Sequence, residues 1–187
     1  MATSTSNNTI ALVDLSTFGA TKVTSGLNAG SIGDYSMAPG SKWVYFAAAP
    51  ETAASKFDLY VFDETTGSPA SVKQIAKSPI VVGPASVYVR YLTATPDGNS
   101  VAYETTGGNN HSISVARAAG GTPTIVVSKT AMDSSPMWAS NGAALLLGVG
   151  VGDTLPKRDL VRVAIGGGSP VTLHAAQAHV SVLYVTP

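Results

Sequence analysis

The chain repeats itself about every fifty residues, and this repeat constrains the fold more than any other feature of the sequence. A turn rich in proline or small residues, followed by a short apolar strand, begins at Pro39, Pro96 and Ser140, and a fourth copy ends at Pro187. These anchors are 57, 44 and 47 residues apart. The spacing predicts a repeat architecture in which one structural unit recurs along the chain.

A second motif lies between the anchors and consists of an alternating strand, a turn rich in glycine and another strand. The first strand of this motif occurs at 9–14, 58–63, 112–117 and 159–164. Several of the turns contain Asp-Gly, Asn-Gly or Gly-Gly, which readily adopt the positive φ angles that tight hairpins require. Each unit of about 47 residues therefore predicts four antiparallel strands.

Four strands form too small a sheet to bury both of their faces alone, whereas sheets stacked face to face bury them together. We therefore predict an all-β fold, a β-propeller or partial propeller of four-stranded antiparallel blades. Aromatic residues recur at equivalent strand positions, and we expect most of them in the core between blades.

Two segments carry a family resemblance, namely Thr95–Tyr103, which reads Thr-Pro-Asp-Gly-Asn-Ser-Val-Ala-Tyr, and Asp58–Asp63, which reads Asp-Leu-Tyr-Val-Phe-Asp. With the Gly-Gly-x-Pro turns, they resemble the WD40-like PD40 repeats of TolB-type β-propellers. The resemblance covers nearly the whole chain from about Asn8, although Ser140-Asn141-Gly142 replaces Pro-Asp-Gly in one copy. It implies the propeller fold and a setting in the bacterial envelope, periplasmic or extracellular.

The sequence supplies fewer complete blades than a closed propeller ring normally contains. We predict one repeat domain at 8–187, with complete blades at roughly 30–76, 86–128 and 135–174, and a flexible segment at 1–7. The two parts of a split blade are expected at 8–25 and 180–187. The chain is then part of a longer propeller, or two copies complete each other's split blade. A four-bladed ring using a strand from 1–7 is less favoured, because that segment is polar.

Composition excludes several classes of function. The 11 Lys and Arg balance the 11 Asp and Glu, so we expect no nucleic-acid partner. The absence of cysteine excludes disulfides, thiol catalysis and thiolate metal sites. The longest apolar run, Ala143–Val149, is too short to span a membrane, and no signal peptide is visible.

The sequence contains no Gly-x-Ser-x-Gly nucleophile motif and no His-Glu-x-x-His metal motif. His111, His174 and His179 are interpreted as ordinary residues of loops and strand ends. We therefore expect no catalytic residue, no metal and no cofactor, and the prediction is that the chain is not an enzyme.

Candidate binding residues fall into two groups. Loops joining the second and third strands of each blade share one face of a propeller, and binding residues concentrate on such loops. They hold much of the scarce charge of this chain and one histidine, and the candidate binding residues are Glu51, Lys56, Glu104, His111, Asp153, Lys157 and Arg158. Aromatic residues on or before the innermost strands are expected to line the central channel: Tyr35, Tyr91 and Trp138.

These observations lead to three hypotheses of function. The first is a non-catalytic scaffold that presents the loops of one propeller face to a protein partner. The second is a structural subunit that self-assembles through its edge blades into a ring, such as a homodimer, or into a filament. The third is the propeller portion of a larger hydrolase, whose catalytic domain would lie elsewhere.

Overall fold

The computed structural model describes residues 2–5, 9–24, 27, 29–50, 57–77, 87–107, 110–129, 136–150 and 158–177. Within these ranges the regular structure is β-strand, apart from two single-turn 3-10 helices, η2 (Glu64–Thr66) and η3 (Pro69–Ser71). No helix in the described ranges is long and apolar enough to cross a membrane. The all-β prediction is confirmed.

The strands form four antiparallel sheets in which neighbours in the chain are also neighbours in the sheet. The first sheet has three strands: β1 (Ala2–Thr5), β2 (Thr9–Val13) and β3 (Ala20–Lys22). The second sheet has four: β4 (Ala29–Met37), β5 (Trp43–Pro50), β6 (Asp58–Asp63) and β7 (Lys73–Ala76). The third has β8 (Val87–Ala94), β9 (Ser100–Gly107), β10 (Asn110–Arg117) and β11 (Thr124–Lys129). The fourth has β12 (Met137–Trp138), β13 (Ala144–Gly150), β14 (Arg158–Ala164) and β15 (Val171–Gln177).

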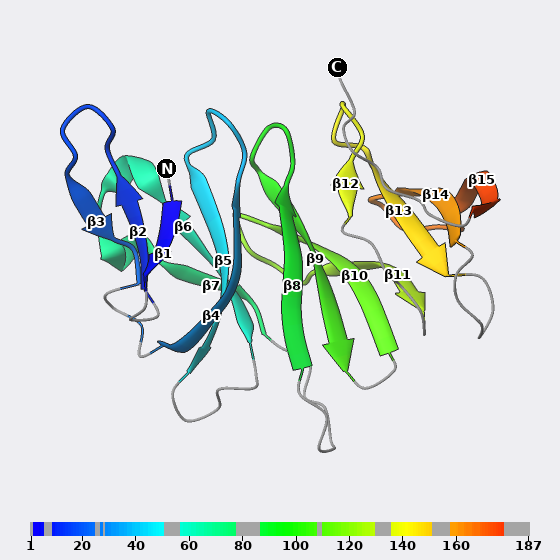
Figure 1. Ribbon diagram of the computed structural model, residues 1–187, viewed down its shortest axis with the longest axis horizontal. Coiled ribbons are helices and arrows are strands. Elements are labelled where there is room, and N and C mark those ends of the chain that lie inside the picture. The colour runs from blue at the N-terminus through cyan, green and yellow to red at the C-terminus, as the bar shows by residue number, and fades with distance from the viewer. Residues whose placement is uncertain are drawn as a thin grey trace.

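The four sheets stand side by side in chain order, with the first and fourth at opposite ends of the row (Figure 1). Three complete four-stranded blades and an incomplete one agree with the predicted partial propeller. The strand predicted at 180–187 lies outside the described residues, so the predicted completion of the split blade is not described.

The N-terminal segment contains a strand, which only the less favoured four-bladed alternative predicted. Ala2–Thr5 forms β1 and pairs with β2 in an antiparallel register that runs from Ala2 opposite Leu12 to Thr5 opposite Thr9. A strand at the edge of a sheet needs only backbone pairing and β-compatible residues, and threonine is such a residue. The polar composition of this segment was therefore a poor guide to its structure.

Tight turns join the first and second strands of each complete blade, and glycine enables them. Gly98 in the Pro96-Asp97-Gly98 turn has φ +70°, and Gly40 and Gly142 occupy the same position with φ +72° and +67°. Gly98 N–H donates to the Thr95 carbonyl at 2.8 Å, and the Asp97 carboxylate accepts from Asn99 N–H at 3.0 Å. The predicted Asp-Gly and Asn-Gly turns thus hold the hairpins in register.

Alternating side chains of β5, in the second sheet, point into two different cores. In β5, Val44 and Phe46 pack toward the first sheet, while Tyr45 and Ala47 pack toward the third sheet. All four of these side chains are completely buried. A strand that is apolar on both faces therefore belongs in the middle of a stack of sheets, as the repeat predicted.

Three apolar layers hold neighbouring sheets together. The layer between the first and second sheets includes Ile10, Val23, Phe46 and Phe62. The layer between the second and third sheets includes Leu59, Ile75, Val101 and Tyr103, and the layer between the third and fourth includes Ile113, Val126, Leu147 and Val163. Burial of these residues is the main force that fixes the position of each sheet relative to the next.

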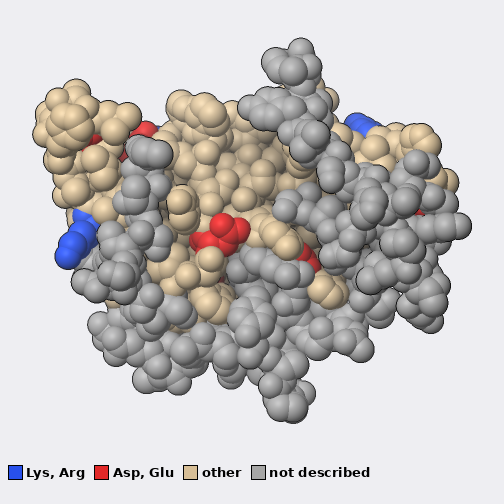
Figure 2. All heavy atoms as spheres, in the orientation of Figure 1, with Lys and Arg blue, Asp and Glu red and all other residues tan. Residues whose placement is uncertain are grey.

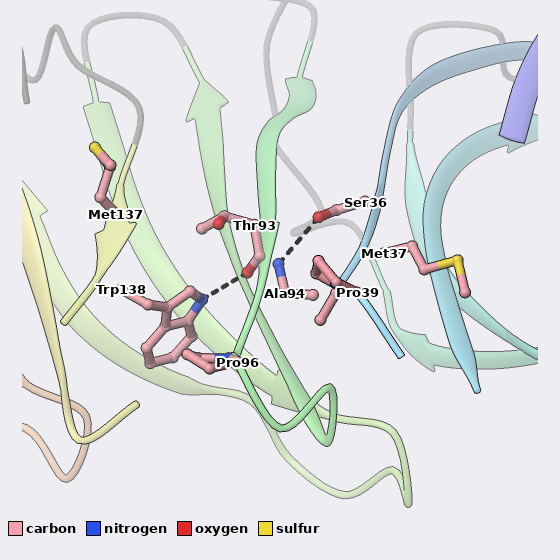
Figure 3. Close-up of a pocket in the computed structure, with 9 residues that line it drawn as sticks. Ser36, Met37, Pro39, Thr93, Ala94, Pro96, Met137 and Trp138 are labelled. Atoms are coloured by element: carbon pink, nitrogen blue, oxygen red, sulfur yellow. Dashed lines mark hydrogen bonds between the residues drawn. The ribbon is translucent and has the colours of Figure 1, made fainter. Parts of the chain in front are cut away.

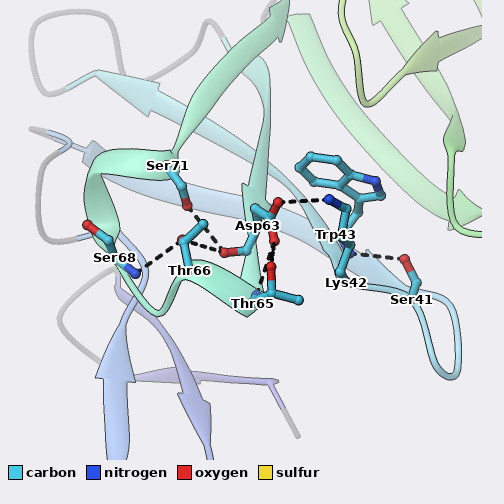
Figure 4. Close-up of polar contacts among 8 residues, drawn as sticks. All are labelled: Ser41, Lys42, Trp43, Asp63, Thr65, Thr66, Ser68 and Ser71. Atoms are coloured by element: carbon cyan, nitrogen blue, oxygen red, sulfur yellow. Dashed lines mark hydrogen bonds and ion pairs between the residues drawn. The ribbon is translucent and has the colours of Figure 1, made fainter.

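The connection from β6 to β7 shows how polar residues support the scaffold (Figure 4). The Asp63 carboxylate caps η2 by accepting from Thr65 N–H at 3.1 Å and from the Thr65 hydroxyl at 2.6 Å. It also accepts from Lys42 Nζ at 3.1 Å. The hydroxyl of Thr65, followed by the neighbouring Lys42, lowers the pKa of Asp63 below its usual value of 3.8.

Acid is expected to destabilise the protein through these turns. Asp14, Asp63 and Asp97 all have lowered pKa values because hydroxyl and N–H groups donate to them. A carboxylate with a lowered pKa stabilises the fold above its unfolded-state pKa and loses that effect as the pH falls through its folded-state pKa. The urea midpoint should therefore drop as the pH is lowered below about 4, and the drop should be smaller in Asp63→Asn. An identical acid response in that variant would contradict the assignment.

Candidate functional site

The innermost strands of the three complete blades meet through hydrogen bonds between side chains and backbone. The Asp34 carboxylate in β4 accepts from Leu92 N–H in β8 at 2.9 Å, and Ser36 Oγ accepts from Ala94 N–H at 3.0 Å. Farther along the row, Trp138 Nε1–H in β12 donates to the Thr93 carbonyl at 2.8 Å. These bonds fix the spacing of the strands that would face the propeller axis.

A cavity of about 360 Å³ lies between the ends of these strands (Figure 3). Its lining residues come from β4, β8, β12 and the turns that follow β4 and β8. They combine apolar side chains with the hydroxyl groups of Ser36 and Thr93. The full lining is Ser36, Met37, Ala38, Pro39, Thr93, Ala94, Pro96, Met137 and Trp138. This space could accept a small apolar group with one or two hydrogen-bonding atoms.

The three residues predicted to line the channel lie on the innermost strands but in different surroundings. Tyr35 and Tyr91 are 40% and 37% exposed, and each lies at an irregularity in the pairing of its strand with the next. Tyr91 also has a positive φ of 53°, which is uncommon for a residue other than glycine. Trp138 is only 8% exposed and belongs to the apolar layer between the third and fourth sheets.

Only Trp138 of the three borders the cavity, so the structure does not bring the predicted aromatic residues together there. Sequence reasoning missed Asp34 and Ser36, which connect β4 with β8. The available signal was Asp34, the single charged residue of an otherwise uncharged innermost strand. A carboxylate at such a position needs a hydrogen-bond donor nearby.

Most of the binding residues predicted on the loops between the second and third strands cannot be located in the structure. Glu51, Lys56, Asp153 and Lys157 lie outside the described residues, and Arg158 is placed only as the first residue of β14. Glu104 and His111 are described, and they lie together on the β9–β10 hairpin with His111 Nδ1 2.5 Å from Glu104 Oε1.

This pair is arranged so that only its imidazole can meet a partner. The Glu104 side chain is 2% exposed, whereas the His111 side chain is 19% exposed. A buried carboxylate in hydrogen-bonding contact with a ring nitrogen fixes the orientation of the ring. The Glu104 side chain is therefore too buried to form part of the surface, although it is one of the predicted binding residues.

Charged groups are sparse on the described surface. On the face shown in Figure 2 most described side chains are uncharged, and the few acidic and basic ones are scattered. Within the described ranges, no group of three or more His, Asp or Glu side chains lies close enough to hold a metal ion.

Comparison with known proteins identifies the fold but no family. No family model matches the chain, and no curated protein matches it. Solved structures do match. A puromycin-hydrolysing peptidase of Mycobacterium tuberculosis superimposes with a TM-score of 0.65 at 16% identity, covering 94% of this chain and 29% of that one.

Two further structures define the architecture. A protein described as TolB from Agrobacterium tumefaciens has a TM-score of 0.58 at 16% identity, with coverage of 95% of this chain and 62% of that one. The β-propeller domain of the trilobed protease from Pyrococcus furiosus has a TM-score of 0.53 at 10% identity, with coverage of 72% and 39%. The four sheets are therefore consecutive blades of a partial β-propeller. The chain spans less than two thirds of the length of each of these proteins.

Proposed function

We propose that this chain is a non-catalytic scaffold that binds a protein partner through its loop edge. The loop edge is the edge of the row where the second strand of each complete blade ends and the third begins, at 50–58, 107–110 and 150–158. Antiparallel order puts these three connections on one side and the glycine turns on the other. A partner that touched the loop edge would contact several blades at once.

The observation that carries this proposal is the set of three apolar layers between the sheets. Because those layers fix each sheet against its neighbour, the ends of β5, β9 and β13 keep a constant spacing along the loop edge. Loops held by a rigid scaffold are common binding elements, since little entropy is lost when they engage a partner. Binding would therefore need little change in the arrangement of the blades.

The use of the acidic side chains supports a role without catalysis. Where the structure describes a hydrogen bond of a carboxylate, that bond supports a turn, a strand or a contact between blades: Asp14, Asp34, Asp58, Asp63, Asp97 and Glu104. General acid–base chemistry requires a carboxylate or histidine that can reach a substrate. Groups already committed to structural bonds are poorly suited to that task.

A charge reversal on the loop edge tests the proposal. The partner would be captured on the immobilised full chain, identified by mass spectrometry, purified, and titrated against each variant. We expect the double variant Lys157→Glu with Arg158→Glu to raise the dissociation constant at least about tenfold, because rim charges guide and hold a partner. Arg117→Glu, at the opposite edge, is the matched control and should bind within about twofold of wild type. Equal losses in both variants, or none in either, would refute the loop edge as the binding surface.

The resemblance to TolB-type repeats supports a periplasmic or extracellular setting for this scaffold. The proposal includes no cofactor and no nucleic acid, since the Lys and Arg residues are balanced by Asp and Glu.

A second candidate is the propeller portion of a larger hydrolase. It is supported by the match to the mycobacterial peptidase, in which the part that resembles this chain makes up 29% of the whole. In that case the loop edge or the cavity would face a catalytic domain. A partner identified in the capture experiment as a hydrolase domain would favour this candidate.

A further inference from the structure

The fourth strands of the three complete blades share one irregularity, which makes their positions comparable. Each contains one extra residue opposite the third strand: Ile75 in β7, Val126 in β11 and Leu173 in β15. The residue after each bulge pairs with the equivalent residue of the third strand. Ala76 faces Leu59, Val127 faces Ile113 and His174 faces Leu160. Leu173 therefore occupies the place of Ile75 and Val126.

The burial of these equivalent residues differs sharply. Ile75 and Val126 are 5% and 6% exposed because the following sheet covers them, whereas Leu173 is 51% exposed. The next residue shows the same difference, since Ala76 and Val127 are buried and His174 is exposed. The last sheet thus presents the kind of side chain that the preceding two sheets bury under a neighbour.

The third and second strands of the fourth sheet extend this comparison. Leu59 and Ile113 are 1% and 0% exposed, but Leu160 is only half-buried. Arg162 is exposed at the position of the buried Val61 and Val115. In the second strands, Tyr45 and Ala102 are completely buried and Leu146 is half-buried. These residues define the open face: Leu146, Leu160, Arg162, Leu173 and His174.

At the other end of the row, the first sheet has an apolar side chain that is less buried than the equivalent side chains of other sheets. Val13 in β2 occupies the position of Phe62 in β6 and Val163 in β14, which pack against the preceding sheet and are both completely buried. Val13 is only half-buried, because no other sheet of the described residues packs on that side of β2. Val13 thus presents a partly exposed apolar side chain at the end of the row opposite the open face.

We propose that the open face binds the first sheet of a second copy of this chain, so that two copies placed head to tail close one ring. Such a pair contributes eight sheets, within the range of about four to eight blades found in closed propellers. The contact continues the apolar layers already present between neighbouring sheets. Closure matters because a head-to-tail contact that fails to close produces a filament.

The mass of the full chain in solution tests this proposal, and two lysine variants locate the contact. Light scattering and sedimentation velocity across a wide range of concentrations should show a species of twice the 18.9 kDa chain mass. Leu173→Lys should raise the dimer dissociation constant at least about tenfold, because a charge replaces an apolar side chain in the contact.

Ile125→Lys is the matched control. Ile125 is also an exposed apolar residue of a fourth strand, at 64%, but it lies on β11 in the third sheet and not on the open face. This variant should dimerise like wild type, and circular dichroism should show that both variants keep the wild-type fold.

Three results would overturn the proposal. A wild-type chain that stays monomeric at all concentrations would leave a further blade of the same polypeptide as the occupant of the open face. A dimer that both variants dissociate, or that neither does, would use another surface. A mass that keeps rising beyond the dimer would exclude a closed pair. None of these results bears on partner binding at the loop edge, which is measured separately.

Discussion

Replacing Phe46 by alanine is expected to lower the free energy of unfolding by about 3–5 kcal/mol. Phe46 is completely buried in the layer between the first and second sheets and stacks on Tyr60 with ring centroids 5.5 Å apart. The substitution removes a large apolar surface and leaves a cavity that the flanking strands cannot fill. Since domains of this size are stable by only about 5–15 kcal/mol, the loss is a large fraction of the total.

Urea unfolding followed by circular dichroism measures this loss, and Phe18→Ala is its control. Phe18 is 81% exposed in the turn between β2 and β3, so its replacement should change the free energy by no more than about 0.5 kcal/mol. Hydrogen exchange adds a local readout. The Val23 N–H, which donates to the Ile10 carbonyl at 2.8 Å in the first sheet, should lose protection in Phe46→Ala. Equal stability of the two variants would mean that this layer does not hold the first sheet.

The sequence predicts the blades well because two local signals agree in each of them. The short apolar runs at 43–49 and 58–63 predict strands, and the glycines at 98 and 142 predict the turns that pair strands of this kind. A strand at β1 was considered but not favoured, because the segment is short and polar and its pairing with β2 depends on the backbone. A hydrophobic pattern carries no information about such a strand.

The candidate site was less predictable, since burial of a polar residue depends on contacts distant in the sequence. Glu104 was predicted in the loop between the second and third strands, but it lies inside β9, and no local pattern showed that its side chain would be 2% exposed and in contact with His111. Likewise, Asp34 reaches Leu92, which lies 58 residues away in the chain. Such pairings follow from the stacking of blades and become visible only when neighbouring blades are in place.

The turn at Gly98 allows a second large effect to be predicted, since it is packed against the neighbouring blade. Gly98→Ala is expected to cost about 2–5 kcal/mol, the sum of two penalties. An alanine in the left-handed region costs about 1–2 kcal/mol, and the forced overlap with a packed neighbour costs about 1–3 kcal/mol. The neighbour is Ser41, whose Oγ and Cβ would overlap the new methyl group.

Two contacts make this overlap difficult to relieve. The Ser41 hydroxyl oxygen accepts from Trp43 N–H at 3.0 Å, and the Gly98 carbonyl accepts from the Tyr45 hydroxyl at 2.7 Å. Burial raises the pKa of Tyr45, as expected for a phenol held in the contact between two blades. Movement of the Gly98 turn away from Ser41 would therefore stretch a buried hydrogen bond, and movement of Ser41 would disturb the start of β5.

Gly40→Ala separates the two penalties, because Gly40 has nearly the same φ, +72° against +70°, but open space where its Cβ would lie. It should cost only the backbone penalty of about 1–2 kcal/mol. The double variant Gly98→Ala with Ser41→Gly removes the overlapping side chain and should recover part of the loss, which a double-mutant cycle in urea measures as a coupling energy. If Gly98→Ala and Gly40→Ala were equally stable, the turn would not be packed against the second sheet, and the contact between these blades would rest on the apolar layer alone.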